Sequence, residues 1–117
     1  MKIKCPWKVG ELKFDKRGEK LILLSFDGTQ LFVYSTLNFK GNDQPVQKLW
    51  RDYKASEMYL PMSIFELEFP RKDPSEYNLD LQLVLLTSAD GCTYIFRLIN
   101  EYELEEHIEN QKIQNTG

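Results

Sequence analysis

The sequence predicts a mainly β protein made of two tandem antiparallel three-stranded β units with a short helix after each; an α+β fold is the alternative. Two apolar runs rich in strand-forming residues, 20–26 and 79–88, support this prediction. Each run is followed by an Asp-Gly pair, which is a strong hairpin signal, and then by a second β-forming segment. An alternating apolar and polar segment precedes each run, at 9–14 and at 63–69, and indicates one more strand in each unit.

The first unit is predicted to contain a tight hairpin. Its Asp27-Gly28 pair predicts a two-residue type I′ turn, in which both residues adopt positive φ. Such a turn pairs Leu24 with Leu31, and this register decides which side chains share a face. The returning strand is predicted at 29–35.

The segment 44–59 has two interpretations. Its apolar and aromatic residues recur at helical spacing, and Asp43 stands where it could cap a helix. The stretch 45–51 fits a short edge strand equally well. The residues of the helical stripe are Val46, Leu49, Trp50 and Tyr53.

The second unit is predicted to repeat the hairpin and to end in a helix. A two-residue turn at Asp90-Gly91 would pair Ala89 with Cys92. The final helix is predicted over 101–111. Asn100 stands in its N-cap position, and Glu103 stands in the capping-box position.

The two halves of the chain are similar to each other. Glu-Leu-Lys-Phe at 11–14 matches Glu-Leu-Glu-Phe at 66–69, and Leu-Ile-Leu-Leu-Ser at 21–25 matches Leu-Val-Leu-Leu-Thr at 83–87. The Asp-Gly pairs follow in the same order. These ordered matches indicate two copies of one β unit, although two ordinary hairpins with a common turn would also explain them. The predicted units, within one domain at 1–117, are 8–59 and 60–112.

Both faces of each predicted hairpin are apolar. An antiparallel sheet with one wet face alternates apolar and polar residues, and these hairpins do not. We therefore expect each hairpin to be covered on both sides, by the other sheet, by a helix or by another chain. The first hairpin is predicted to carry Ile22, Leu24, Leu31 and Val33 on one face and Leu21, Leu23, Phe32 and Tyr34 on the other. The second is predicted to carry Leu83, Leu85, Tyr94, Phe96 and Leu98 on one face and Val84, Leu86 and Ile95 on the other.

Two stretches resemble the second and third strands of a WD-repeat β-propeller blade. They are 83–100, with Thr-Ser-Ala-Asp-Gly-Cys-Thr-Tyr-Ile-Phe, and 21–37, with Ser-Phe-Asp-Gly-Thr-Gln-Leu-Phe-Val-Tyr. The resemblance implies blades that stack around an axis and bind proteins by their rims. Two blades cannot close a ring of about 4–8. It therefore implies a fragment, pairing with other copies or completion of a partner, and a distinct compact α+β fold is the remaining reading.

Catalytic and metal-binding patterns are missing from the sequence. The lone histidine, His107, is on the predicted final helix without a nucleophile at a recognisable spacing. Cys5 and Cys92 do not make a disulfide framework or a zinc motif, and we expect Cys92 to be packed inside a strand. We therefore expect no enzymatic activity, no cofactor and no metal site.

A protein partner or self-association is the predicted mode of action. A net charge of −3 disfavours nucleic-acid binding, and no apolar run approaches the ~20 residues of a membrane span. The start of the sequence lacks a signal-peptide pattern, so a cytoplasmic location is expected. The predicted function is a non-enzymatic protein-protein interaction or scaffolding module, which could belong to a larger complex. The alternative is a small acidic inhibitor or immunity-type protein that neutralises one partner protein. The candidate partner-binding residues are Trp50, Arg51, Tyr53, Glu105 and Glu109.

Overall fold

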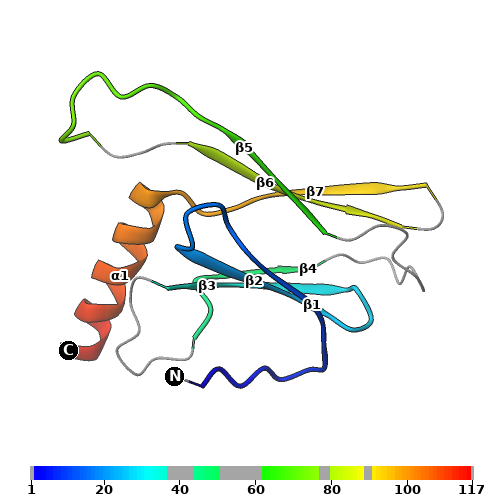
Figure 1. Cartoon of the computed structure of the whole chain (residues 1–117). Helices are drawn as coiled ribbons and strands as arrows, with labels where there is room; N and C mark the ends of the chain where they lie inside the picture. Colours follow the sequence, from blue (N-terminus) through cyan, green and yellow to red (C-terminus); the bar gives the residue numbers. More distant parts are fainter. Residues whose placement is uncertain (1, 37–43, 51–61, 77–79, 89–90, 117) are drawn as a thin grey trace.

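The fold is mainly β, as predicted, with two antiparallel sheets and one helix (Figure 1). The structure is a computed structural model, and it describes residues 2–36, 44–50, 62–76, 80–88 and 91–116. The first sheet has the order β1-β2-β3-β4 and the second has the order β5-β6-β7. The strands are β1 (Val9–Phe14), β2 (Lys20–Ser25), β3 (Gln30–Ser35), β4 (Gln47–Trp50), β5 (Ser63–Leu67), β6 (Leu81–Thr87) and β7 (Thr93–Arg97), and the helix is α1 (Glu101–Thr116).

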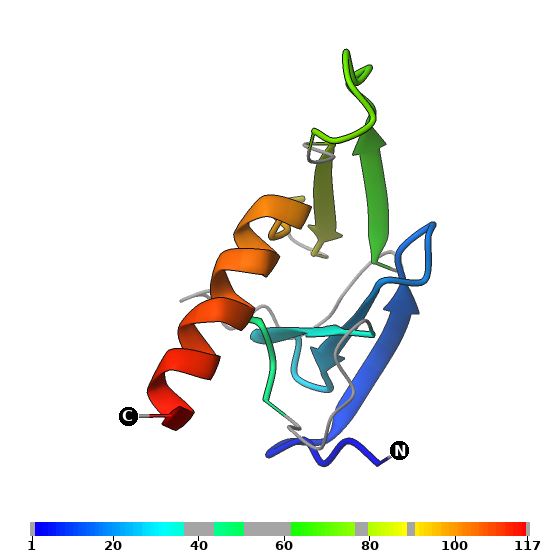
Figure 2. The same ribbon diagram turned by 90° about the vertical axis from the view of Figure 1, so that its left-hand side faces the viewer.

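The core lies between the two sheets, which form two layers in Figure 1 with α1 along one side. Apolar side chains from β2 and β3 pack against those from β6, because hydrophobic burial is the main favourable term in folding. Figure 2 shows the same layers from the side, with the second sheet above the first. The buried core residues are Ile22, Leu24, Leu31, Val33, Met62, Val84, Leu86 and Leu98.

The N-terminal segment covers the part of the outer face of the first sheet that β2 and β3 form. Ile3, Cys5 and Trp7 pack against the buried residues of this face, which are Leu23, Phe32 and Tyr34. The rings of Trp7 and Phe32 lie 4.9 Å apart between centroids, and Trp7 Nε1 donates to Gln30 Oε1 at 3.1 Å. The first hairpin is therefore covered on both sides, with the face composition predicted from the sequence.

The segment after β3 forms a strand where a helix was the other interpretation. β4 pairs antiparallel with β3, and Leu49 on β4 packs against the core. Pairing in this way satisfies the open edge of β3, which a helix would leave unpaired. The helix predicted after the first unit is thus not shown: the described part is a strand, and the rest of 44–59 lies outside the described residues.

The first hairpin has the predicted register but not the predicted turn. Leu24 pairs with Leu31, as expected. Among the described residues only glycines have positive φ, so Asp27 does not adopt the conformation that a type I′ turn requires. The Gly28 amide instead donates to Ser25 O at 2.9 Å, and the Ser25 hydroxyl accepts from the amides of Thr29 and Gln30. The hydroxyl of Ser25 thus organises a wider loop without changing the register.

The second hairpin is shifted by one residue from the predicted register. Leu86 pairs with Tyr94, and the Ser88 amide donates to Cys92 O at 2.9 Å, which leaves three residues between them. A slip of one residue moves every side chain of a strand to the other face. Tyr94 and Phe96 therefore pack into the core with Val84, and Ile95 lies on the outer face, which reverses the predicted assignment.

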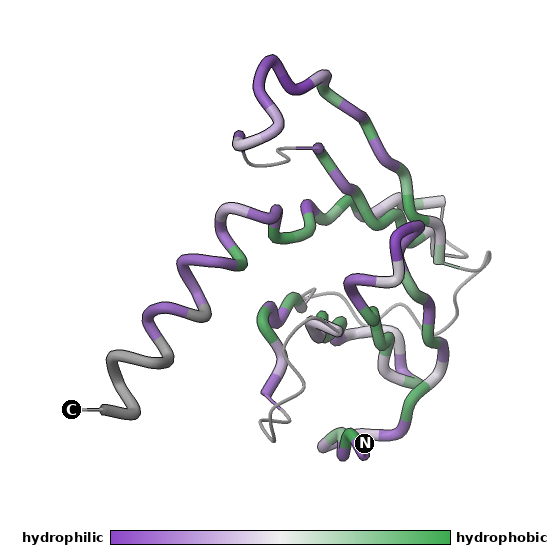
Figure 3. The backbone as a smooth tube through the Cα atoms, turned by 60° about the vertical axis from the view of Figure 1, so that its left-hand side comes forward, coloured by the Kyte–Doolittle hydropathy of each residue, from purple (hydrophilic) through white to green (hydrophobic). Residues whose placement is uncertain are grey.

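The helix α1 is confirmed in position and extends to Thr116. The Asn100 side chain accepts from the Glu103 amide at 2.9 Å, as the predicted cap requires. Leu104 is buried, while Figure 3 shows that most of the coloured part of the helix is hydrophilic. Within the described residues, no helix has the length and apolar character needed to span a lipid bilayer.

Candidate protein interface

Trp50, the first predicted binding residue, is exposed at the end of β4. Its side chain is 69% exposed and lies beside a shallow hollow of about 540 Å³ that Phe32 and Lys48 also line. The Lys48 ammonium stands 5.4 Å from the centroid of the Phe32 ring. Trp50 is therefore accessible from solvent. The predicted binding residues Arg51 and Tyr53 lie outside the described residues.

The predicted acidic residues lie on a separate element. Glu105 and Glu109 are exposed on α1. Figure 1 shows β4 running away from α1. The structure therefore does not bring Trp50 together with Glu105 and Glu109.

An exposed apolar surface lies on the second sheet instead. Its outer face has no cover from the described segments, and the exposed fractions are 53% for Phe65, 42% for Leu67 and 61% for Ile95. The half-buried leucines of β6 lie between them in the ladder. Of the covers that the sequence analysis allowed, neither the other sheet nor the helix lies on this face within the described residues, and cover by another chain stays a prediction. We call this face the open face; it consists of Phe65, Leu67, Leu81, Leu83, Leu85 and Ile95.

Sequence reasoning placed Leu83 and Leu85 on one face of the second hairpin and Ile95 on the other, and expected both faces to be covered. The alternation at 63–69 correctly places Phe65 and Leu67 on one face. It does not say whether that face is inside or outside, because periodicity identifies a face and not its neighbour. The signal that could have drawn attention to the face is the apolar composition of both sides of the sheet, since only one side can face the first sheet.

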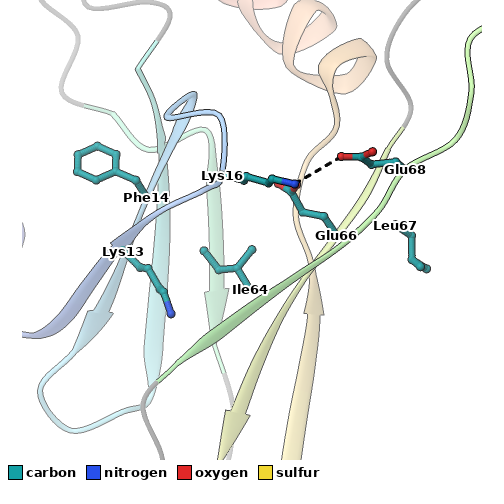
Figure 4. Close-up of a pocket in the computed structure, with 7 residues that line it drawn as sticks. All are labelled: Lys13, Phe14, Lys16, Ile64, Glu66, Leu67 and Glu68. Atoms are coloured by element: carbon teal, nitrogen blue, oxygen red, sulfur yellow. Dashed lines mark ion pairs between the residues drawn. The ribbon is translucent and has the colours of Figure 1, made fainter.

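A groove separates β1 from β5 at one side of the molecule. Its volume is about 640 Å³, and Figure 4 shows Lys13, Lys16, Ile64 and Glu66 directed into it. Phe14 and Leu67 point away from it, toward the outer faces of their sheets. Two edge strands thus line a space within the size range of ligand-binding pockets.

Side chains bridge this groove at its two ends. At one end the Met62 amide donates to Glu11 Oε2 at 3.0 Å, and Lys13 Nζ donates to Met62 O at 3.0 Å. At the other end Lys16 Nζ and Glu68 Oε1 lie 3.9 Å apart, and both side chains are exposed. An exposed pair of this kind contributes less than ~1 kcal/mol. The second end of the groove is therefore held only weakly.

A second corner of the sandwich is closed by one amide side chain. Gln47 on β4 donates from Nε2 to Arg97 O at 2.9 Å and accepts from the Ile99 amide at 3.0 Å. It thus occupies a backbone donor and a backbone acceptor of the second sheet, as a neighbouring strand would. The two sheets are thus linked by side-chain hydrogen bonds at this corner as well as across the β1–β5 groove.

A buried polar cluster also joins the sheets. Lys20 Nζ donates to Gln82 Oε1, while Gln82 Nε2 donates to Asp15 Oδ2 at 3.1 Å and to Glu66 Oε1 at 2.5 Å. Burial lowers the pKa of the Lys20 ammonium below its ordinary value, and the nearby carboxylate of Asp15 opposes this effect. Asp15, Lys20 and Gln82 are all buried.

The geometry of this cluster favours a structural role. A buried lysine with a lowered pKa can mark a catalytic site. The adjoining cavity is only about 20 Å³, which is space for about one water molecule and not for a substrate. The cluster therefore satisfies buried polar groups between the sheets, as a closed network does.

The remaining reactive side chains are dispersed. Cys92 is exposed, so the expectation that it packs inside a strand is wrong; the loop before it ends the ladder at Ser88. Cys5 Sγ lies 3.8 Å from Tyr34 Oη. His107 is half-buried on α1, and its Nε2 has no hydrogen-bond partner among the described residues. Within the same residues, no group of three side chains is arranged to bind a metal ion.

Comparison of the chain with protein-family models, with curated proteins and with solved structures finds no match.

Proposed function

We propose that this protein is a non-enzymatic interaction module that binds a partner protein through the open face of its second sheet. The observation that carries the proposal is the exposure of Phe65, Leu67 and Ile95 on one continuous sheet surface. Monomeric proteins rarely expose extended apolar patches, and such patches mark protein-protein contact sites. The predicted role as part of a larger complex fits such a surface.

The contrast with the first sheet supports this proposal. There the chain covers the outer residues of β2 and β3 with Ile3, Cys5 and Trp7 and leaves only the outer residues of β1 exposed. The second sheet has a comparable apolar outer face without such a cover among the described segments. Covering it with a partner would bury aromatic and aliphatic side chains, which are typical anchors of protein interfaces.

Site-specific photocrosslinking in cells tests the proposal. A photoreactive phenylalanine analogue would replace Phe65 or Ile95 in the full chain. The matched control position is Phe26, which is 67% exposed but lies in the first hairpin loop under Lys8. We expect one crosslinked protein from positions 65 and 95 and not from position 26. Equal crosslinking from all three positions, or none from 65 and 95, contradicts the proposal.

Light scattering of the purified chain then separates a foreign partner from a second copy. A monomer that gives a heterologous crosslink in cells indicates a foreign partner. A concentration-dependent dimer that dissociates in an Ile95→Asp variant indicates self-association through the open face. In both cases Ile95→Asp should leave the folded state intact, because the side chain is already largely in solvent.

A further inference from the structure

The facing edges of β1 and β5 are two incomplete ladders. Within the part of the chain that the structure describes, β1 pairs only with β2, and β5 pairs only with β6. Glu11 and Lys13 contact Met62 just before β5, and Lys16 contacts Glu68 just after it, so the two strands run in the same direction. Unpaired strand edges are templates for another strand.

The hydrogen bonds of β1 show which of its backbone groups face the groove. The Asp15 amide donates to Lys20 O at 3.0 Å, which makes these two residues a hydrogen-bonded pair of the β1–β2 ladder. Hydrogen-bonded pairs alternate along an antiparallel ladder, so Lys13 is also bonded toward β2. The N–H and C=O groups of Leu12 and Phe14 therefore point away from β2, toward β5. Both side chains lie on the outer face.

The same reasoning applies to β5. The Leu98 amide donates to Gln82 O at 2.9 Å, which sets even-numbered residues of β6 toward β7 and odd-numbered ones toward β5. Phe65 is paired with Leu83 and is bonded toward β6. The N–H and C=O groups of Ile64 and Glu66 therefore face the groove, and the side chains of these two residues lie on the inner side.

The backbone groups that face the groove belong to residues with outward side chains on β1 and to residues with inward side chains on β5. A single inserted strand could therefore pair with both edges. Successive residues of a strand direct their backbone groups to opposite neighbours and their side chains to opposite faces. A strand between β1 and β5 would pair its outward residues with Leu12 and Phe14. It would pair its inward residues with Ile64 and Glu66. The backbone edges of β1 and β5 are also not bonded directly to each other here. The contacts across the gap come from the side chains of Glu11 and Lys13, which reach Met62.

We propose that an extended segment of a partner protein inserts between β1 and β5, antiparallel to both, and joins the two sheets into one. Its outward side chains are apolar, because they would lie between Leu12 and Phe14 on one side and Phe65 and Leu67 on the other. Five of the ten large apolar side chains that are exposed among the described residues lie on β1 and β5. Its inward side chains are polar, since they would meet Lys13 and Glu66. This proposal rests on the proposed function and specifies how the partner binds.

Charge argues against a second copy of this chain as the occupant. A symmetric dimer places the same edge of both copies together. Two β1 edges paired about a twofold axis at Lys13 would place that lysine opposite its equivalent, and two β5 edges paired about an axis at Glu66 would do the same with the glutamate. Like charges directly opposite each other destabilise a strand pair. A foreign strand avoids this repulsion, and on entering it displaces the exposed Lys16–Glu68 pair and the contacts of Glu11 and Lys13 with Met62.

Selection from a phage-displayed library of random peptides on the full wild-type chain tests the proposal. We expect the selected peptides to alternate apolar and polar residues. Amide hydrogen exchange followed by NMR should show fast exchange at Leu12, Phe14, Ile64 and Glu66 in the free protein and slow exchange when a peptide is bound. A library that yields no binding peptide, or peptides that leave these four amides unprotected, overturns the proposal.

N-methylation of a selected peptide distinguishes insertion from addition to one edge. Between two strands every central amide of the peptide donates to one neighbour or the other. We therefore expect each central N-methyl group to weaken binding about fivefold to tenfold, as for one lost hydrogen bond. Tolerance at every second position would place the peptide against a single edge and overturn the proposal.

A protein variant separates this proposal from the proposed function. Leu12→Pro removes one groove-facing N–H, and proline is tolerated at such an edge position. Its folded state would be verified by urea unfolding. We expect weaker peptide binding and loss of the cellular crosslink. If Ile95→Asp abolishes the crosslink while folded Leu12→Pro leaves it and peptide binding unchanged, strand insertion is overturned and the interaction module stands.

Discussion

The two sheets have similar inner faces and different outer faces. Both inner faces contribute buried side chains to one core, and both sheets carry apolar residues on the opposite side as well. On the first sheet the N-terminal segment covers the outer residues of β2 and β3 and leaves Leu12 and Phe14 of β1 exposed, whereas on the second sheet no described segment covers Phe65 or Ile95. The two outer faces are therefore similar in composition and differ in how much of each the chain itself covers.

The largest expected effect is equal for both sheets and lies in the shared core. Leu31→Ala on β3 and Leu86→Ala on β6 each remove a fully buried side chain and leave a cavity. We expect each to lower the free energy of unfolding by about 3 kcal/mol, measured by urea denaturation. A much smaller loss for Leu86→Ala would mean that the second sheet does not share one cooperative core with the first.

The next largest effect is expected for the buried polar cluster that joins the two sheets. Lys20→Met leaves Gln82 Oε1 without its donor and leaves Asp15 buried without the nearby positive charge. We expect a loss of about 2 kcal/mol at neutral pH, because an unsatisfied buried polar group keeps its desolvation cost.

The pH dependence of this link has a defined sign. Burial places the pKa of folded Lys20 below its unfolded value, so the unfolded state binds more protons between the two values. The stability of the wild-type protein should therefore rise with pH through that alkaline window, relative to Lys20→Met. Urea unfolding of both proteins at several alkaline pH values measures the difference. A difference that is constant or falls with pH contradicts a buried ammonium.

The outer faces should respond differently to truncation. Trp7→Ala removes the ring that packs on Phe32 and the donor to Gln30, and we expect a loss of about 1.5 kcal/mol. Ile95→Ala on the open face should change stability by less than ~0.5 kcal/mol. Thermal and urea unfolding of both variants provide the measurement. Equal losses would show that the open face is covered in the free protein.

The smallest expected effect lies in the first hairpin loop. Hydrogen bonds from Ser25 and Thr29 lower the pKa of the Asp27 carboxyl to about 2. Because the folded value is below the unfolded one, this contribution is present above about pH 4 and is lost as the pH falls toward 2. Asp27→Asn should remove this dependence and cost less than ~1 kcal/mol at neutral pH, since the group is exposed and screened. Unfolding curves at pH 7 and pH 3 compare the two proteins.

The candidate site could be predicted only in part. Trp50 was singled out from its sequence context and is exposed, but Glu105 and Glu109 lie on another element. The open face was missed because Phe65 and Leu67 have the pattern of core residues. The β1–β5 groove left no sequence signal, since it arises from two edges that are distant in the chain and only meet when the sheets stack.

The sequence by itself determined where the strands other than β4, the first hairpin register and the capped helix lie, because turn chemistry, periodicity and capping act over a few residues. The tertiary structure decided that 47–50 is a strand, through the open edge of β3, and that Tyr94 faces the core, through the loop at Ser88. It also decided which apolar face is covered. The position of a residue in the alternating pattern decides on which face of its sheet the side chain lies. Whether that side chain is buried depends on which distant segment lies opposite that face.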